Sequence, residues 1–223
     1  MTPADICVVI PTLNEASGIA ATMESVAAAG QIIVVDGGST DDTLAIVRAS
    51  SRVTLVRSPA GRGRQLAAGV NQSDRQVIVF LHGDCHLSPG SLDRIVEAVA
   101  EGNPWGALRQ RIAAHGIAYR LLELGNAARV QWRGMVFGDQ ALFVSATLLG
   151  QVGGIESVAL MEDVRLSQRL RRRHWPVLID ATVVVNARRW AKRGVIYQTA
   201  VNWWLQILHA AGVSPERLRK MYR

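Results

Sequence analysis

The chain has 223 residues, of which 49% are hydrophobic and 19% are charged, and its formal net charge at pH 7 is +7, with a pI of about 10.4. This length and apolar content predict one ordinary α/β domain with a sizeable core. The first residues have no basic n-region or long apolar stretch, and no segment of bilayer-spanning length is free of polar breaks, so we expect neither a signal peptide nor a transmembrane helix.

The first half of the chain alternates strand-like and helix-like segments. Apolar, β-branched runs predict strands at 6–10, 32–36, 53–57 and 77–81, and the segments between them predict helices at 16–29, 41–49, 64–71 and 91–100. Gly30 is a good residue to end the first helix, and Ser39 can cap the second. Strands that alternate with helices form right-handed βαβ units, so we expect an α/β fold with a mostly parallel, twisted central sheet flanked by helices.

The second half is less regular. Strands are predicted at 106–111, 141–144 and 177–185, the last interrupted near Asp180, and helices at 117–129, 161–173, 195–211 and from Ser214 onward. In the final helix Ser214 is the expected cap and Pro215 the first residue. We find no internal repeat and no low-complexity linker, which predicts a single domain.

Two predicted strands end in acidic residues. Asp36 closes the strand at 32–36, and Asp84 follows the strand at 77–81 through His82 and Gly83. Ligands bind beside the carboxyl ends of parallel strands, so we expect the two carboxylates to converge on one cleft. One carboxylate together with diphosphate oxygens can hold Mg²⁺ or Mn²⁺, while His82 either bonds a ribose or is packed in the interior.

Two turns in the first half have the composition of ligand-binding loops. The turn at 11–15 follows the first strand and either caps a helix or contacts a nucleotide base or ribose. The segment 61–64, Gly-Arg-Gly-Arg, opens a helix and suits either an anion or a solvated surface turn. Neither turn has the spacing of a Walker loop or of a dinucleotide-binding loop.

Acidic residues recur in the second half. Glu162 and Asp163 stand at a predicted helix start, where they either complement the helix dipole or include a general base. Asp139 and Gln140 precede an apolar run and either form a turn or line the edge of an acceptor site.

Basic and apolar patches concentrate toward the C-terminus. Lysines and arginines gather at 169–173, 188–193 and 217–223; each cluster alone is an ordinary solvated face, but together they favour an anionic partner such as phosphates, acidic lipids or nucleic acid. The tryptophan-rich segment 195–208 predicts either a helix packed on the sheet or another subunit, or an interfacial helix on an anionic membrane. Cys7 and Cys85 are expected to be reduced, which favours an intracellular compartment.

In order and spacing these motifs resemble those of the family 2 glycosyltransferases, whose fold is called GT-A. The matching segments are 9–15 (Val-Ile-Pro-Thr-Leu-Asn-Glu), 33–43 (Ile-Val-Val-Asp-Gly-Gly-Ser-Thr-Asp-Asp-Thr), 63–71, 81–84 (Leu-His-Gly-Asp), 138–140, 153–154 and 162–163. The chain most resembles small bacterial members described as radical-SAM/selenodomain-associated, which carry Leu-His-x-Asp in place of the usual Asp-x-Asp. The resemblance implies a catalytic domain over 1–190. It leaves 191–223 as a helical extension of the same domain or as a contact with a membrane or another subunit.

The resemblance also implies a role for each matching residue. These roles are general base for Asp163; donor binding for Pro11, Thr12, Glu15, Asp36, Gly63, Arg64, His82 and Asp84; metal binding for Asp84; acceptor binding for Asp139, Gln140 and Glu162; and closure over the diphosphate for Arg189 and Trp190. The implied reaction is a direct displacement that inverts the anomeric carbon, assisted by Mg²⁺ or Mn²⁺.

Two other classes stay open at this point. One is a non-catalytic protein that binds membranes or nucleic acid on a decayed transferase fold. The other is a nucleotidyltransferase, although its basic glycine-rich loop would follow the first strand rather than the third. We expect a cytoplasmic protein that binds a nucleotide-sugar donor and no nucleic acid. A lipid-linked acceptor, attachment to the cytoplasmic face of the membrane and a homodimer are left open.

Overall fold

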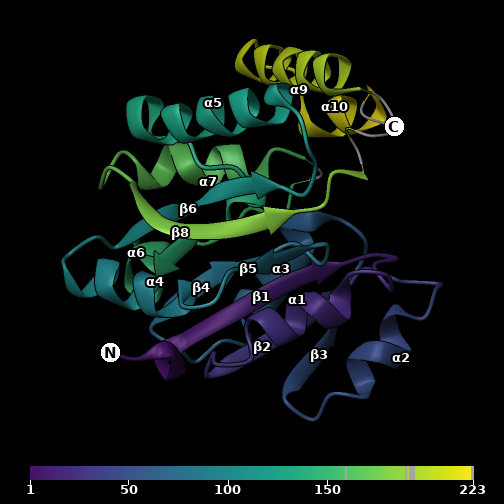
Figure 1. Ribbon diagram of the computed structural model, residues 1–223, viewed down its shortest axis with the longest axis vertical. Coiled ribbons are helices and arrows are strands. Elements are labelled where there is room, and N and C mark those ends of the chain that lie inside the picture. The colour runs from purple at the N-terminus through teal and green to yellow at the C-terminus, as the bar shows by residue number, and fades with distance from the viewer. Residues whose placement is uncertain (159, 189, 191–193, 222–223) are drawn as a thin grey trace.

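The computed structural model describes residues 1–158, 160–188, 190 and 194–221 (Figure 1). One eight-stranded sheet forms its centre, in the order β3-β2-β1-β4-β7-β6-β8-β5. The strands are β1 (Ile6–Thr12), β2 (Gln31–Asp36), β3 (Val53–Arg57), β4 (Val77–Phe80), β5 (Cys85–Leu87), β6 (Trp105–Ile112), β7 (Phe143–Ser145) and β8 (Val177–Val185). The sheet is of the mixed α/β kind that the sequence predicts.

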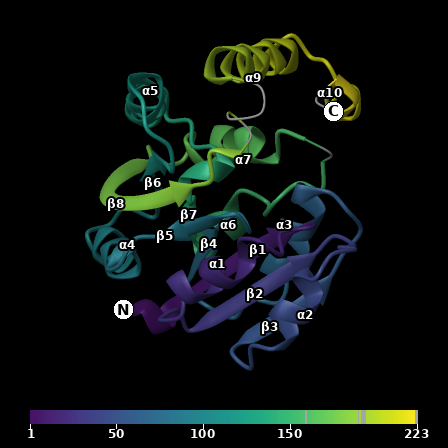
Figure 2. The same ribbon diagram turned by 45° about the vertical axis from the view of Figure 1, so that its right-hand side comes forward.

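Helices and short 3-10 turns connect these strands. The helices are α1 (Ile19–Ser25), α2 (Thr43–Arg48), α3 (Arg62–Val70), α4 (Ser91–Ala100), α5 (Ile117–Arg133), α6 (Ala146–Gln151), α7 (Glu162–Leu170), α9 (Val195–Ala210) and α10 (Pro215–Met221), and the turns are η1 (Pro3–Asp5) and η2 (Gly138–Gln140). Both views place α5 and α9 at the same end of the molecule, away from β2 and β3 (Figures 1 and 2).

The sheet has a parallel half and a mixed half. β3, β2, β1 and β4 are parallel neighbours, with Val9 of β1 paired to Ile33 on one side and to Phe80 on the other. β7 lies antiparallel between β4 and β6, and β8 runs parallel to β6. The carboxyl ends of β1, β2 and β4 therefore meet at one edge, where the functional acids were predicted.

Two apolar layers cover the two faces of the sheet. Side chains alternate along β1, so Val8 belongs to one layer and Val9 to the other, and both are fully buried. Helices α1, α2 and α4 supply residues to the first layer, and α3, α6 and α7 to the second. Burial on both faces explains why these strands are apolar runs rather than alternating sequences.

A third, smaller apolar cluster holds the C-terminal helices. Leu205 of α9 and Leu218 of α10 pack with Met135, Met161 and Val164. The last of these residues lies in α7, so α9 is fixed above the start of that helix. Within the described part of the chain, no helix is both long enough and apolar enough to cross a membrane.

Several predicted boundaries need correction. The helix expected at 16–29 spans only Ile19–Ser25, because Asn14 is left-handed (φ 57°) and the backbone N–H of Ala16 donates to Asp41 rather than starting a helix. Ser39 does not cap α2; its hydroxyl accepts from the N–H of Asn14, and the cap position belongs to Asp42.

Three features of the second half bear on the sequence prediction. The interruption expected near Asp180 is confirmed, since the β6–β8 register shifts between Leu108 and Arg109. The sequence missed β5, a short edge strand paired to β8, and α6, although Ser145 gives a cap signal by accepting from the N–H of Leu148. Short elements are missed because few residues leave little periodicity to detect.

The approach of α3 to the sheet yields a test of the packing. A Cβ added at Gly69 would collide with Cγ1 of Val9 and lie 3.0 Å from Cγ2 of Val35, whereas one added at Gly125 of α5 would meet open space. We expect Gly69→Ala to lower the free energy of unfolding by about 1–3 kcal/mol. The control Gly125→Ala should raise it by up to about 1 kcal/mol. Urea denaturation measures both, and equal stability of the two variants would contradict this packing.

Candidate active site

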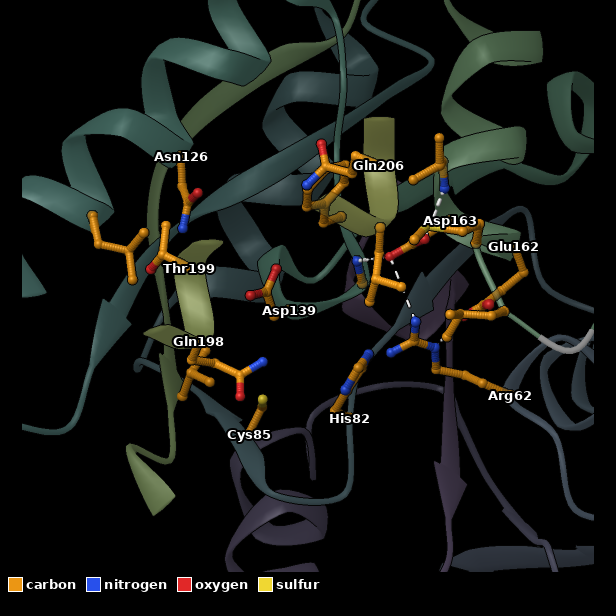
Figure 3. Close-up of a pocket in the computed structure, with 18 of the residues that line it drawn as sticks. Arg62, His82, Cys85, Asn126, Asp139, Glu162, Asp163, Gln198, Thr199 and Gln206 are labelled. Atoms are coloured by element: carbon orange, nitrogen blue, oxygen red, sulfur yellow. Dashed lines mark hydrogen bonds and ion pairs between the residues drawn. The ribbon is translucent and has the colours of Figure 1, made fainter. Parts of the chain in front are cut away.

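A cavity of about 360 Å³ lies beneath α9 and beside the carboxyl end of β4. This volume is typical of small-molecule sites. The wall residues that carry polar side chains are Arg62 of α3, His82, Asp84 and Cys85 after β4, Asn126 and Arg129 of α5, Asp139, Glu162 and Asp163 at the start of α7, Asn186 after β8, Trp190, and Gln198, Thr199 and Gln206 of α9; Figure 3 labels most of them. The cavity therefore brings together segments from most of the chain.

Asp163 is held in this wall by backbone groups. The N–H of Gly138 donates to its Oδ2 at 2.9 Å, and the N–H of Val164 donates to its Oδ1 at 2.8 Å. Met161, just before α7, is left-handed (φ 67°), a strained conformation that turns the chain so that the acids begin the helix. Carboxylate oxygens have further lone pairs, so Asp163 can still accept a proton.

Glu162 and Arg62 form a buried ion pair beside Asp163. Arg62 Nε donates to the Glu162 carboxylate, and its terminal nitrogen lies 3.8 Å from Asp163 Oδ2. Burial raises the pKa of Glu162 above its ordinary value; Arg62 opposes that change and the neighbouring Asp163 adds to it. Arg62 thus places one positive charge beside the two carboxylates of Glu162 and Asp163, so the net charge of these three side chains is negative.

Asp84 also lines the cavity and has a cation of its own nearby. Arg188 donates to Glu15 Oε2 at 2.9 Å and lies 3.7 Å from Asp84 Oδ2. The turn that carries Asp84 is closely packed, since a Cβ at Gly83 would lie 3.0 Å from the methyl of Thr12. A positive charge therefore already faces the carboxylate that the sequence assigned to metal binding.

Asp36 occupies a separate hollow at the same sheet edge. Its carboxylate accepts from the N–H groups of Gly38 and Ser39, and it lines a shallow depression with Arg57 and Pro59. Asp36 and Asp84 thus share the edge, as the strand ends predict, but they line two hollows rather than one cleft.

The other residues that the sequence assigned to donor binding differ in how deeply they are buried. Thr12 is buried, and its carbonyl accepts from the side chain of Gln65. Pro11, also in β1, is only partly buried. Gly63 packs against the backbone of 156–158, and Arg64 is exposed outside the cavity.

Arg62, and not Arg64, lines the cavity. The sequence missed Arg62 because it started the helix at residue 64, whereas α3 begins at residue 62. The glycine-arginine segment contains both arginines, and Arg62 stands two residues before the start that the sequence predicted for this helix.

Arg129 is a second residue that the sequence missed. Its guanidinium lies 3.5 Å above the ring of Phe137 and donates to Asn126 Oδ1, Gln140 Oε1 and the carbonyl of Met135. Burial lowers the pKa of Arg129 to about 10, and Asp139 partly opposes this, so the side chain stays charged at neutral pH. A lone arginine within a predicted amphipathic helix gave no signal of this role.

The remaining predicted residues divide between the wall and the interior. Asp139 lines the cavity and accepts from Gln110 at 2.7 Å. Gln140 is fully buried and bonded to Arg129, so it lies behind the wall. Trp190 lines the cavity, while Arg189 lies outside the described residues.

A divalent cation at this site would depend on few protein ligands. Among the residues that the structure describes, no three histidines, cysteines or acids are grouped to hold a metal. Asp84 is nevertheless a hard oxygen donor on the cavity wall. It fits Mg²⁺ or Mn²⁺ if the ligand supplies further oxygens.

Comparison with known proteins identifies the family. The model of the family "Glycosyl transferase family 2" matches residues 7–137, which include β1, β2, β4 and α5. The chain belongs to this family. The identification of this chain as a family 2 glycosyltransferase from its sequence motifs is therefore confirmed.

Two known relatives align with part of this chain. A glycosyltransferase of Mycobacterium tuberculosis is 26% identical over 128 residues, which is 57% of this chain and 58% of that protein. An undecaprenyl-phosphate 4-deoxy-4-formamido-L-arabinose transferase of Sodalis glossinidius is 26% identical over 156 residues, 63% of this chain and 48% of that protein. The chain thus spans about half the length of these relatives.

Solved structures support the fold. A mannosyltransferase from Pyrobaculum calidifontis, determined with GDP-Man and Mn²⁺, superposes with a TM-score of 0.62 at 19% identity, over 82% of this chain and 58% of that one. This likeness establishes the GT-A architecture of the family for this chain.

Proposed function

We propose that this protein transfers a sugar from a nucleotide-diphosphate sugar to an acceptor hydroxyl with inversion. The observation that carries the proposal is the position of Asp163, which backbone N–H groups hold in the wall of the same cavity as Asp84. A carboxylate base and a strand-end acid in the wall of one cavity are the groups that a metal-assisted direct displacement uses. Family membership supports this function over a nucleotidyltransferase or a non-catalytic binding protein.

The donor would span the two hollows of the sheet edge. Asp36, together with Pro11 and Thr12 of β1, would hold the base and ribose, and the diphosphate would lie toward Glu15 and Asp84. The Mn²⁺ and GDP-Man of the Pyrobaculum enzyme support a nucleotide-sugar donor and a cation here. We assign neither the nucleotide nor the sugar.

Mg²⁺ or Mn²⁺ held by Asp84 would supply Lewis-acid stabilisation of the leaving diphosphate. Arg188 adds a positive charge at the same place, next to Glu15 and Asp84. His82 stands where other members of the family carry an acid, and it lines the cavity. Arg64, Arg189 and Gly63 keep their assignment to the diphosphate region as part of this proposal, with Trp190 closing the donor site.

The chemical step follows from Asp163. The acceptor hydroxyl gives its proton to the Asp163 carboxylate as its oxygen attacks the anomeric carbon. The bond from that carbon to the diphosphate oxygen breaks on the opposite face, which inverts the configuration. Glu162, Asp139 and Gln140 would shape the acceptor side, with Arg62 holding Glu162 in place.

We also propose that the enzyme works at an anionic membrane surface on a lipid-linked acceptor. Helix α5 exposes Ile117, Leu121, Leu124 and Trp132, and α9 exposes further apolar side chains. The two helices lie at the same end of the molecule (Figure 2). We call these residues of α5 the apolar face. Exposed arginines at 171–173 flank it, which suits acidic head groups.

Three narrower assignments belong to the same proposal. The chain would belong to the radical-SAM/selenodomain-associated subgroup, on the strength of Leu81-His82-Gly83-Asp84. Residues 1–190 would form the catalytic domain. The segment 191–223 would cover the cavity and contact the membrane, and a homodimer through the apolar face is the competing use of that surface.

Asp163→Asn tests the base. We expect it to lower nucleoside diphosphate release by about 10²–10⁴-fold, because the amide cannot take the proton. Donor affinity should stay within about two-fold. The assay screens UDP- and GDP-sugars with Mn²⁺ and scores free nucleoside diphosphate against pyrophosphate. Asp93→Asn, at an exposed position of α4, is the matched control. Unchanged turnover would refute the assignment, and pyrophosphate release would indicate a nucleotidyltransferase.

Asp84→Asn tests the cation site. We expect the wild-type protein to bind its nucleotide sugar at least ten-fold more tightly with Mn²⁺ than without, and the variant to lose this difference, because an amide oxygen is a weaker ligand than a carboxylate. Calorimetry in the presence and absence of Mn²⁺ measures both proteins. Equal donor affinity under the two conditions in the wild-type protein would remove Asp84 from this role.

Vesicle sedimentation tests the membrane surface. We expect the protein to bind vesicles of phosphatidylcholine with 30% phosphatidylglycerol, and the binding to weaken as salt screens the arginines. The double variant Leu121→Gln, Leu124→Gln should lose most of it, while Leu13→Gln, an exposed leucine elsewhere, should not. Absence of binding to anionic vesicles would contradict the proposal. A concentration-dependent dimer abolished by the same double variant would assign the face to self-association.

A further inference from the structure

Part of the cavity is left unused by the transfer step. Figure 3 shows Asn126 and Thr199 on the side away from Arg62 and Asp163, with Asp139 between the two sides. Helix α9 supplies Thr199 to this part of the wall, and α5 supplies Asn126. We refer to this part as the distal chamber. Asp139 lies between this chamber and Asp163, so one molecule can reach from the chamber toward the base.

Four buried polar atoms of this cavity have no hydrogen-bond partner within the described part of the chain. They are Asp139 Oδ1, Glu162 Oε2, Trp190 Nε1 and Thr199 Oγ1. Glu162 and Trp190 are buried almost completely, with 2% and 8% of their surfaces exposed. A buried polar group without a partner costs about 1–3 kcal/mol, so such groups are rare unless a ligand or water satisfies them.

The chemistry of these four atoms specifies the missing partner. The two carboxylate oxygens only accept, the indole N–H only donates, and the hydroxyl of Thr199 does both. A molecule in this cavity therefore meets both acceptors and donors on the wall. Hydroxyl groups on a ring both donate and accept, and the cavity of about 360 Å³ has room for more than isolated waters.

Charge argues against an anionic occupant. The cavity wall carries the carboxylates of Asp84, Asp139, Glu162 and Asp163 against two guanidinium groups. One of these, Arg62, is paired with Glu162 and Asp163. A phosphate in the distal chamber would therefore lie beside the Asp139 carboxylate, in a cavity whose wall carries more carboxylates than guanidinium groups, and like charges in a poorly solvated site repel.

The second guanidinium group, that of Arg129, does not neutralise this excess of carboxylates. Arg129 is oriented by Asn126 and Gln140 and lies over Phe137, so its hydrogen bonds go to the protein rather than into the chamber. Trp190 and Phe137 add aromatic surface to the same wall. Sugars present apolar C–H faces between their hydroxyls, which such surface covers well.

We propose that the distal chamber binds an uncharged sugar ring of the acceptor, so that the attacking group is a sugar hydroxyl and not a phosphate. The proposal rests on the transferase function above and names the acceptor class for it. Asp139 and Thr199 bind hydroxyls of the ring through the atoms that lack a partner among the described residues. A lipid attached to such a sugar would leave the cavity past α9, toward the apolar face.

Ligand-observed NMR tests this on the full chain. The probes are the methyl glycosides of glucose, galactose, mannose and N-acetylglucosamine, with inorganic phosphate and decyl phosphate as competitors. We expect saturation transfer to at least one glycoside, about ten-fold weaker binding in Thr199→Val and in Asp139→Asn, and no displacement by either phosphate. Thr54→Val, on the exposed side of β3, and Asp93→Asn are the matched controls.

Three outcomes would overturn the proposal. They are displacement of the glycoside by decyl phosphate or inorganic phosphate, equal glycoside binding in both variants, and absence of saturation transfer from all four glycosides. Donor binding is measured in parallel on the same proteins. If nucleotide sugars bind the wild-type chain and both variants, a negative glycoside result refutes the acceptor class alone. If they do not bind the wild-type chain, the transferase function itself fails.

Discussion

The guanidinium of Arg129 is the contact on which the geometry of the cavity depends. It donates to Gln140 and to the carbonyl of Met135, so it fixes the two ends of the short loop that contains Gly138. The N–H of Gly138 in turn orients the Asp163 carboxylate. A buried cation on α5 therefore positions an acid on α7. Removing one side chain from such a network leaves its partners without hydrogen bonds in a poorly solvated place, where the loss of stability is largest.

The distribution of charge around this network divides the cavity by chemistry. Near β4, Arg188 brings a cation to Glu15 and Asp84, which favours the phosphates of a donor. Among the described residues that line the cavity, carboxylates outnumber guanidinium groups, and Asp139 Oδ1 has no hydrogen-bond partner among them. In the proposed function, the phosphates of the donor take the side near Arg188 and the hydroxyls of the acceptor take the side near Asp139.

Much of the fold and some of the site could be predicted because the patterns that indicate them lie within short segments of the sequence. Each central strand is a short apolar run, and burial on both faces makes such runs visible in the sequence. Asp36 and Asp84 follow their strands directly, so the parallel topology places them at one edge. Arg62 and Arg129 were missed for different reasons. The first depended on a helix start two residues earlier than expected, and the second on a tertiary contact with the loop before β7.

The sequence by itself determined the family, the GT-A sheet and the acids at its edge, because these follow from strand periodicity and from motifs contiguous in the chain. The tertiary structure alone decided which of these residues share a cavity. It separated Asp36 from Asp84, put Gln140 behind the wall, and brought Thr199 of α9 toward Asp139. The physical reason is that a cavity is defined by side chains from helices distant in sequence. Their mutual orientation is set by packing and buried hydrogen bonds that no local pattern encodes.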